Sequence, residues 1–163
     1  EKAARLPEDI EWHFIGRLQS NKARKAVQLA KVIHSVDSAA LLERLDRIAG
    51  EERKRPAVLL EVNVSGEASK AGVPVAELEP FARRAAACAN LDFRGFMTMA
   101  PFDAEPVKIA AIFELLRLTR DELEAKLGRE LPELSMGMSG DYEIAARHGS
   151  TIVRVGTLIF GTR

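Results

Sequence analysis

The sequence has little of several features that mark specialised classes of protein. One cysteine among 163 residues, Cys88, excludes an internal disulfide and leaves no metal-ligand spacing of cysteines. The 24 basic residues balance the 24 acidic ones, so overall charge favours neither a nucleic-acid nor a membrane partner. No apolar run is long enough for a membrane span, and the charged opening Glu1-Lys2 is unlike a signal peptide. We therefore expect a protein of the reducing cytoplasm. Cys88, in an alanine-rich run, is predicted to be an unreactive, buried helix residue.

Short apolar runs alternate along the chain with longer helical patterns, which is typical of βα units around a parallel sheet. We predict six strands, at Trp12–Gly16, Val32–Val36, Ala57–Val64, Phe93–Met99, Leu134–Met138 and Thr151–Val155. We predict helices at Ala39–Ala49, Pro74–Ala89, Val107–Leu127 and Asp141–Arg147. Ser38 is the expected N-cap of the first of these, and Gly128 is the expected C′ residue of the third.

No linker, low-complexity tract or repeat divides the chain, so residues 1–163 are predicted to form one domain. The pattern fits about six of the eight βα units of a (β/α)8 TIM-type barrel, whose full length is typically about 250 residues. The α/β pattern alone also allows an open doubly wound sheet. However, no strand is followed by the Gly-x-Gly-x-x-Gly fingerprint of dinucleotide-binding folds.

The last two predicted strands end in residues suited to binding an anion. Ser139 follows the fifth strand and is expected to cap the next helix, whose free N–H groups would face an anion. Gly156 and Thr157 follow the sixth strand and offer close backbone approach and a hydroxyl donor. If the six strands are the third to eighth of a barrel, these loops lie where such barrels commonly bind phosphate. The alternative is an ordinary helix cap and a turn glycine.

Arg154 lies inside the apolar run of the last strand, where an arginine is rarely buried without a partner. The two-residue period of a strand places Arg154 on the same face as Ile152 and Gly156. We therefore expect it to face the same place as the Gly156 loop. A structural salt bridge to Glu61 or another carboxylate is the alternative.

Five motifs, in order from residue 12 to residue 161, resemble those of the YggS/PROSC-type pyridoxal phosphate homeostasis proteins. The family's W-H-F-I-G-x-L-Q-x-N-K signature is matched at residues 12–22, and its V-N-x-x-x-E-x-S-K-x-G segment at residues 62–72. Its G-L-M-T-I-x-P segment is similar to residues 95–101. Its closing motifs are matched at residues 134–139 and 153–161.

The resemblance implies the barrel of the alanine racemase N-terminal domain and a pyridoxal 5′-phosphate (PLP) cofactor. It implies that Ser139, Gly156 and Thr157 hold the phosphate and that Arg154 faces the pyridine nitrogen. A guanidinium has only donors, so it would favour an unprotonated ring nitrogen. Further implied cofactor neighbours are His13, Asn63 and Met136, with Met97 beside them. For His13 a hydrogen-bonded core histidine is the alternative, and for the methionines it is core packing.

One part of the family pattern does not occur in the sequence. The family's V-S-K-like motif, whose lysine forms the Schiff base with the cofactor, is absent, and so is the E-N-Y-type motif that follows it. The eight lysines present lie in helical or loop patterns, and Lys70 is a weak substitute. We therefore expect an N-terminally incomplete barrel, with the chain a fragment of a longer protein.

The leading hypothesis is a PLP-binding protein of intracellular cofactor homeostasis, with no catalytic residues, which delivers PLP to apoenzymes and works as a monomer. The alternative from another class is a PLP-dependent amino-acid racemase. A third hypothesis is that the basic segment from Arg17 to Lys31 binds nucleic acid or a protein. Aromatic side chains do not interleave with its charges, so a solvated helix face is favoured there.

Overall fold

A single curved parallel sheet organises the molecule. The computed structural model describes residues 5–7, 9–67 and 70–161. Within these residues the six main strands are β1 (His13–Phe14), β2 (Val32–Val36), β3 (Ala57–Asn63), β5 (Asp92–Met97), β6 (Glu133–Met138) and β7 (Ile152–Arg154). They follow the spatial order β1-β2-β3-β5-β6-β7, and every neighbouring pair is parallel. The predicted parallel α/β architecture with six strands is therefore confirmed.

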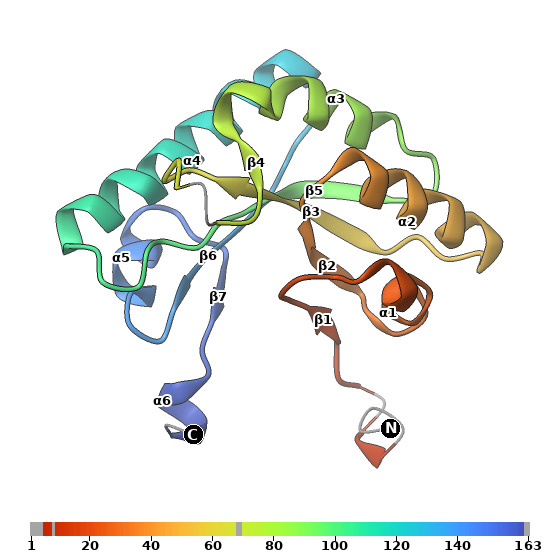
Figure 1. Cartoon of the computed structure of the whole chain (residues 1–163), viewed down its shortest axis with the longest axis horizontal. Helices are drawn as coiled ribbons and strands as arrows, with labels where there is room; N and C mark the ends of the chain where they lie inside the picture. The colour runs from red at the N-terminus through yellow and green to blue at the C-terminus, as the bar shows by residue number, and fades with distance from the viewer. Residues whose placement is uncertain (1–4, 8, 68–69, 162–163) are drawn as a thin grey trace.

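Helices follow the strands and cover the outer side of the sheet, which makes a partial barrel (Figure 1). They are α1 (Ala23–Leu29), α2 (Ala39–Glu51), α3 (Leu78–Ala87), α4 (Pro106–Leu127) and α5 (Tyr142–Arg147), with the short α6 (Thr157–Phe160) after β7. The 3-10 turns η2 (Ser20–Lys22) and η3 (Val75–Glu77) precede α1 and α3. In Figure 1, β1 and β7 stand at the two ends of the arc, with the inner side of the sheet open between them.

The hydrophobic core lies between the sheet and these helices. In β3, Val58, Leu60 and Val62 belong to this core, together with Phe113 and Leu116 of α4. The residues between them on β3 alternate to the opposite face, because successive side chains of a strand point to opposite sides. The sheet therefore has an outer face packed on helices and an inner face that lines the partial barrel.

Strand β2 departs from simple alternation. Its pairing with β3 shifts register between Ile33 and Val36, and both of these residues belong to the outer core. An irregularity of this kind changes which side chains point to which face. Ordinary alternation from Ile33 already places His34 on the inner face, where its ring contacts residues of β1 and β6. The shift accounts for Val36, which would otherwise share that face.

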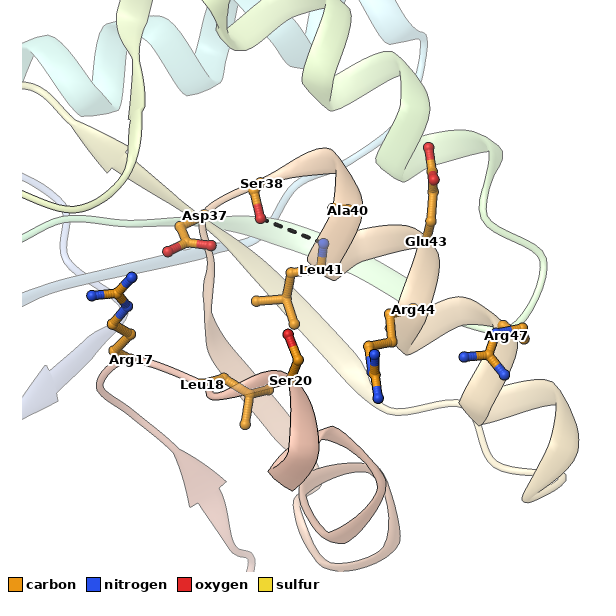
Figure 2. Close-up of a pocket in the computed structure, with 10 residues that line it drawn as sticks. All are labelled: Arg17, Leu18, Ser20, Asp37, Ser38, Ala40, Leu41, Glu43, Arg44 and Arg47. Atoms are coloured by element: carbon orange, nitrogen blue, oxygen red, sulfur yellow. Dashed lines mark hydrogen bonds between the residues drawn. The ribbon is translucent and has the colours of Figure 1, made fainter.

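Two of the predicted helix ends are confirmed. Ser38 accepts a hydrogen bond from the Leu41 N–H at 3.4 Å and caps α2 (Figure 2). Gly128 ends α4 with a left-handed backbone at φ 61°. The predicted helix from Pro74 begins later, because Pro74 pairs with β3 in the short strand β4 (Val73–Pro74) and α3 starts at Leu78. Cys88 lies one residue beyond α3 and is half-buried, and burial raises the pKa of its thiol to about 11.

Candidate functional site

A chain of polar side chains crosses the inner face from β1 to β7. His13 Nδ1 lies 2.9 Å from His34 Nε2, and His34 Nδ1 lies 2.9 Å from Ser135 Oγ. Arg154 donates to Ser135 Oγ at 2.7 Å and to the Thr98 carbonyl at 3.0 Å. His34, Thr98 and Ser135 are each at most 1% exposed. Buried polar groups of this kind must satisfy one another, so their positions are mutually fixed.

Arg154 is held by neutral groups. Within the described residues no carboxylate lies within 4.0 Å of its guanidinium, so the alternative of a direct salt bridge to Glu61 is wrong. Burial lowers the pKa of Arg154, while the charges of Asp141 and Glu61 oppose that effect. Arginine nevertheless stays protonated in proteins. A fixed positive charge therefore stands at the end of β7.

Glu61 is the buried acid of the inner face. It is 4% exposed, and in the described part of the chain its carboxyl group makes no hydrogen bond or salt bridge. Burial raises the pKa of Glu61, the charge of Asp37 raises it further, and Arg154 lowers it. The inner face thus carries a buried acid, Glu61, and a half-buried cation, Arg154, which influence each other's pKa but form no ion pair.

The predicted anion-binding residues meet in one cavity of about 420 Å³ at the carboxyl ends of β6 and β7. Its lining consists of Ala100, Pro101, Phe102, Ile109, Met138, Ser139, Gly140, Asp141, Arg154, Gly156 and Thr157. This set brings together Ser139, Arg154, Gly156 and Thr157, four of the seven residues predicted from the sequence. No lysine of the described residues lines the cavity.

Ser139 does not play the structural part predicted for it. The N-cap of α5 is Asp141, whose carboxylate accepts the Met138 N–H at 2.5 Å. Ser139 Oγ instead accepts the Gly156 N–H at 3.1 Å, which ties the β6 loop to the β7 loop. The prediction of a Ser139 cap is therefore wrong, because the aspartate two residues later occupies that position.

Two glycines near the cavity have different roles. Gly137 has φ 94°, and a Cβ there would lie 2.6 Å from the Ala145 Cβ, so glycine lets α5 pack closely against β6. Gly156 has an ordinary φ of −123°, and a Cβ there would meet no atom within 4 Å. The absence of a side chain at Gly156 therefore keeps space open beside Ser139 and the first turn of α6.

The other three predicted residues lie outside this cavity. His13, which is exposed, joins the polar chain described above. Asn63 donates to the Glu67 carbonyl and accepts the Gly66 N–H, so its side chain orders the loop after β3. Met136 is fully buried in the outer core, on the same side of β6 as Leu134. Core packing, the alternative interpretation of Met136, therefore describes its surroundings.

Sequence reasoning missed the middle of the polar chain. His34 and Ser135 were assigned to strands without a role, and Thr98 was not singled out. The available signal was the one that drew attention to Arg154, a polar residue within an apolar strand. His34 follows the apolar Val32 and Ile33 in β2, and Ser135 stands between Leu134 and Met136.

A second cavity, of about 780 Å³, lies between the segment after β1 and helix α2 (Figure 2). Arg17, Arg44 and Arg47 line it together with Asp37 and Glu43, and Figure 2 shows the Arg17 guanidinium directed toward Asp37. Its mixed charges favour no single class of ligand. In the described residues no group of three or more histidine, cysteine or acidic side chains is placed to hold a metal ion.

Comparison with known proteins relates this architecture to one family. The family profile described as "Alanine racemase, N-terminal domain" matches residues 3–163. A pyridoxal phosphate homeostasis protein of Aquifex aeolicus is 42% identical over 155 residues, which are 95% of this chain and 68% of that protein. The protein of the same name from Synechocystis is 42% identical over 156 residues, covering 96% of this chain and 72% of the relative.

Solved structures agree with the sequence relatives. PipY of Synechococcus elongatus without PLP superposes with a TM-score of 0.93 at 43% identity, covering 98% of this chain and 76% of PipY. PipY with PLP bound gives 0.89 at 41% identity, with 98% and 74% covered. Alanine racemase of Clostridium difficile, at 11% identity and a TM-score of 0.78, shares the fold alone. Across the residues that the structure describes, none of the helices combines the length and hydrophobicity needed to cross a membrane.

Proposed function

The chain belongs to the family of the pyridoxal phosphate homeostasis proteins, and from that premise we propose that it binds pyridoxal 5′-phosphate, buffers it and delivers it to apoenzymes. The observation that carries the proposal is the single cavity lined by Ser139, Arg154, Gly156 and Thr157. When bound, PLP supplies an electrophilic aldehyde and an electron-accepting ring. The chain's own residues supply the grip on its phosphate and its ring nitrogen.

We call the part of the cavity around Ser139, Gly156 and Thr157 its phosphate end, and its hydrogen-bond donors and open space suit an anion. The Gly156 N–H, the Thr157 hydroxyl and the Ser139 hydroxyl lie together where β6 and β7 end. Hydroxyl and backbone N–H groups are the donors that recognise phosphate. The space that a Cβ of Gly156 would take is available to a phosphate oxygen. Asp141 lines the same cavity, but its carboxylate is engaged with the Met138 N–H.

We call the part of the cavity beside Arg154 its ring end, and it suits an unprotonated pyridine nitrogen. Arg154 uses two of the five N–H donors of a guanidinium on Ser135 and Thr98, and the described residues take none of the other three. A donor-only cation opposite a pyridine nitrogen favours the unprotonated ring. An unprotonated ring withdraws electrons less strongly than one paired with a carboxylate, which suits holding the cofactor more than catalysis.

Calorimetric titration of the chain with PLP, pyridoxal and inorganic phosphate tests this proposal. We expect PLP to bind at least about tenfold more tightly than pyridoxal, since a charge-assisted phosphate contact contributes about 1.5 to 3 kcal/mol. Inorganic phosphate should compete with PLP. Equal affinities for PLP and pyridoxal would remove the phosphate site from the proposal.

Gly156→Val is the sharpest variant for the phosphate end. The new side chain enters open space at a permitted φ, so it should fill the anion site and leave the fold intact. We expect about a tenfold loss of PLP affinity with an unchanged melting temperature. Thr119→Val, which introduces the same side chain on α4 away from the cavity, is the control and should leave the PLP affinity unchanged.

We expect PLP to bind this chain without a covalent bond, because the family's Schiff-base lysine motif is not in the sequence. Reduction with borohydride at stoichiometric PLP, followed by mass spectrometry, should leave every lysine unmodified. A modified Lys70 would show that a substitute lysine exists. Residues 1–163 act in this proposal as one binding domain and as a monomer, which size-exclusion chromatography with light scattering tests.

A catalytic role is not part of the proposal. Relatives at about 42% identity are homeostasis proteins by name, while the likeness to alanine racemase is one of fold. Incubation with L-alanine and PLP should therefore produce no D-alanine. Steady accumulation of D-alanine would overturn the binding-protein assignment.

A further inference from the structure

The hydrogen-bonded chain His13–His34–Ser135–Arg154 has a direction that the distances alone do not give. A histidine ring nitrogen donates or accepts according to where its hydrogen lies. The contacts of 2.9 Å on either side of His34 therefore have two possible arrangements. Which arrangement the protein adopts decides which nitrogen of each histidine carries the hydrogen.

His34 is neutral and so has a single ring hydrogen to place. Burial lowers the pKa of His34 to about 4, and the neighbouring His13 and Arg154 lower it further while Glu133 opposes the effect. At neutral pH one of its nitrogens must therefore donate and the other must accept. Either Nε2 donates to His13 and Nδ1 accepts from Ser135, or both bonds run the other way.

Arg154 decides between the two arrangements. Its guanidinium can only donate, so at 2.7 Å it occupies one lone pair of Ser135 Oγ. If His34 also donated to Ser135, the hydroxyl hydrogen would have no acceptor among the described contacts, in a side chain that is 0% exposed. If Ser135 donates to His34, the Ser135 hydroxyl hydrogen and the His34 ring hydrogen both have acceptors. A buried donor without an acceptor is strongly unfavourable, so the arrangement in which Ser135 donates to His34 is preferred.

We propose that Arg154 orders a one-way hydrogen-bond chain, in which Ser135 donates to His34 and His34 donates to His13. Ser135 and His34 are then positioning residues for Arg154. Ser135 accepts one hydrogen of the guanidinium and is itself held by His34, and the Thr98 carbonyl accepts another hydrogen of the guanidinium. The remaining donors keep one orientation toward the cavity. The direction of the hydrogen-bond chain is a property of the ligand-free protein. Only the role of the remaining Arg154 donors, to bind the ring nitrogen of PLP, rests on the proposed function.

Nitrogen-15 NMR of the imidazole rings in the ligand-free chain tests the direction. The sequence has three histidines, so each ring can be assigned. At about pH 8, above the usual imidazole range, His34 and His13 should both carry hydrogen on Nε2 and none on Nδ1. His148 is an internal reference of the opposite kind, because its Nδ1 lies 3.0 Å from the Glu114 carboxylate, which can only accept. Hydrogen on Nδ1 of His34 would overturn the proposal.

Two substitutions test whether Arg154 sets the direction of the hydrogen-bond chain. Arg154→Lys keeps a donor-only group and should keep the Nε2 form of His34. Arg154→Gln offers an acceptor as well as a donor, so it should release the direction and populate the Nδ1 form measurably. An unchanged single Nε2 form in Arg154→Gln would show that Arg154 does not order the chain.

A ligand measurement tests the positioning role separately. The wild type should prefer PLP over its 1-deaza analogue, which has carbon in place of the ring nitrogen, by about tenfold. Ser135→Ala and His34→Leu should reduce that preference severalfold while both ligands still bind through phosphate. His148→Asn, outside the chain, should leave it unchanged. A full preference in Ser135→Ala would refute the positioning role. If PLP does not bind at all, the proposed function fails, and the NMR result still decides the direction.

Discussion

The two faces of the one parallel sheet follow different rules. On the outer face, Ile33, Leu60 and Phe96 pack against helices and need only exclude water, so a side chain of similar size and polarity would serve. On the inner face, His34 and Ser135 are equally buried, and each depends on a particular partner across the sheet. The outer face therefore contributes stability to the fold, and the inner face determines which polar groups are available for binding.

The outer face is the place to test for the largest effect on stability. Phe113→Ala should lower the free energy of unfolding by about 3 to 5 kcal/mol, because Phe113 is 0% exposed and its removal leaves a cavity. Chemical denaturation measures this loss. Phe102→Ala, which removes a ring that is 91% exposed, is the matched control and should shift stability by less than about 0.5 kcal/mol. Similar losses in both variants would contradict the assignment of the core.

His34 makes the inner face sensitive to acid. Because folding lowers the pKa of His34 from 6.5 to about 4, the unfolded chain takes up the proton first as the pH falls. The stability from neutral His34 is complete above pH 6.5 and is lost progressively toward pH 4, by about 3 kcal/mol in all. Denaturation at several pH values should show this slope in the wild type and in His148→Asn. His34→Leu should lack it, and an unchanged slope there would assign the acid sensitivity to another group.

Of these substitutions, the one at Glu61 should change the free energy of unfolding least, and it should stabilise the fold. Its pKa is raised by burial, so the charged form present at neutral pH is unfavourable in the folded state. Glu61→Gln should therefore raise the free energy of unfolding by about 1 kcal/mol at neutral pH, and the gain should shrink in acid as Glu61 itself takes up a proton. Glu43→Gln, an exposed carboxylate of α2, is the control and should be neutral. A loss of stability in Glu61→Gln would mean that the carboxylate has a favourable partner.

Most of the fold could be predicted from patterns among residues that are neighbours in the sequence. The apolar run of β3, the buried stripe of α2 and the Ser38 cap were all readable, because each depends on neighbouring residues. The convergence of Arg154, Gly156 and Thr157 on one cavity followed from strand direction and alternation. The register shift in β2 was not readable, since it depends on pairing with β3. The contact between His34 and Ser135, 101 positions apart, was not readable either. Met136 shows a limit of another kind: alternation separates it from Ser135, but the pattern alone did not say which face was the outer one.

In the free protein, Ser139 Oγ accepts the Gly156 N–H and so occupies a donor that an anion would use. An incoming phosphate would have to displace an internal acceptor before it gained the Gly156 donor, so the measured affinity would be a difference between two sets of bonds. Ser139→Ala would then remove one contact to the anion and, at the same time, release another donor for it. A near-neutral result for that variant would reflect this exchange and would not place Ser139 outside the site.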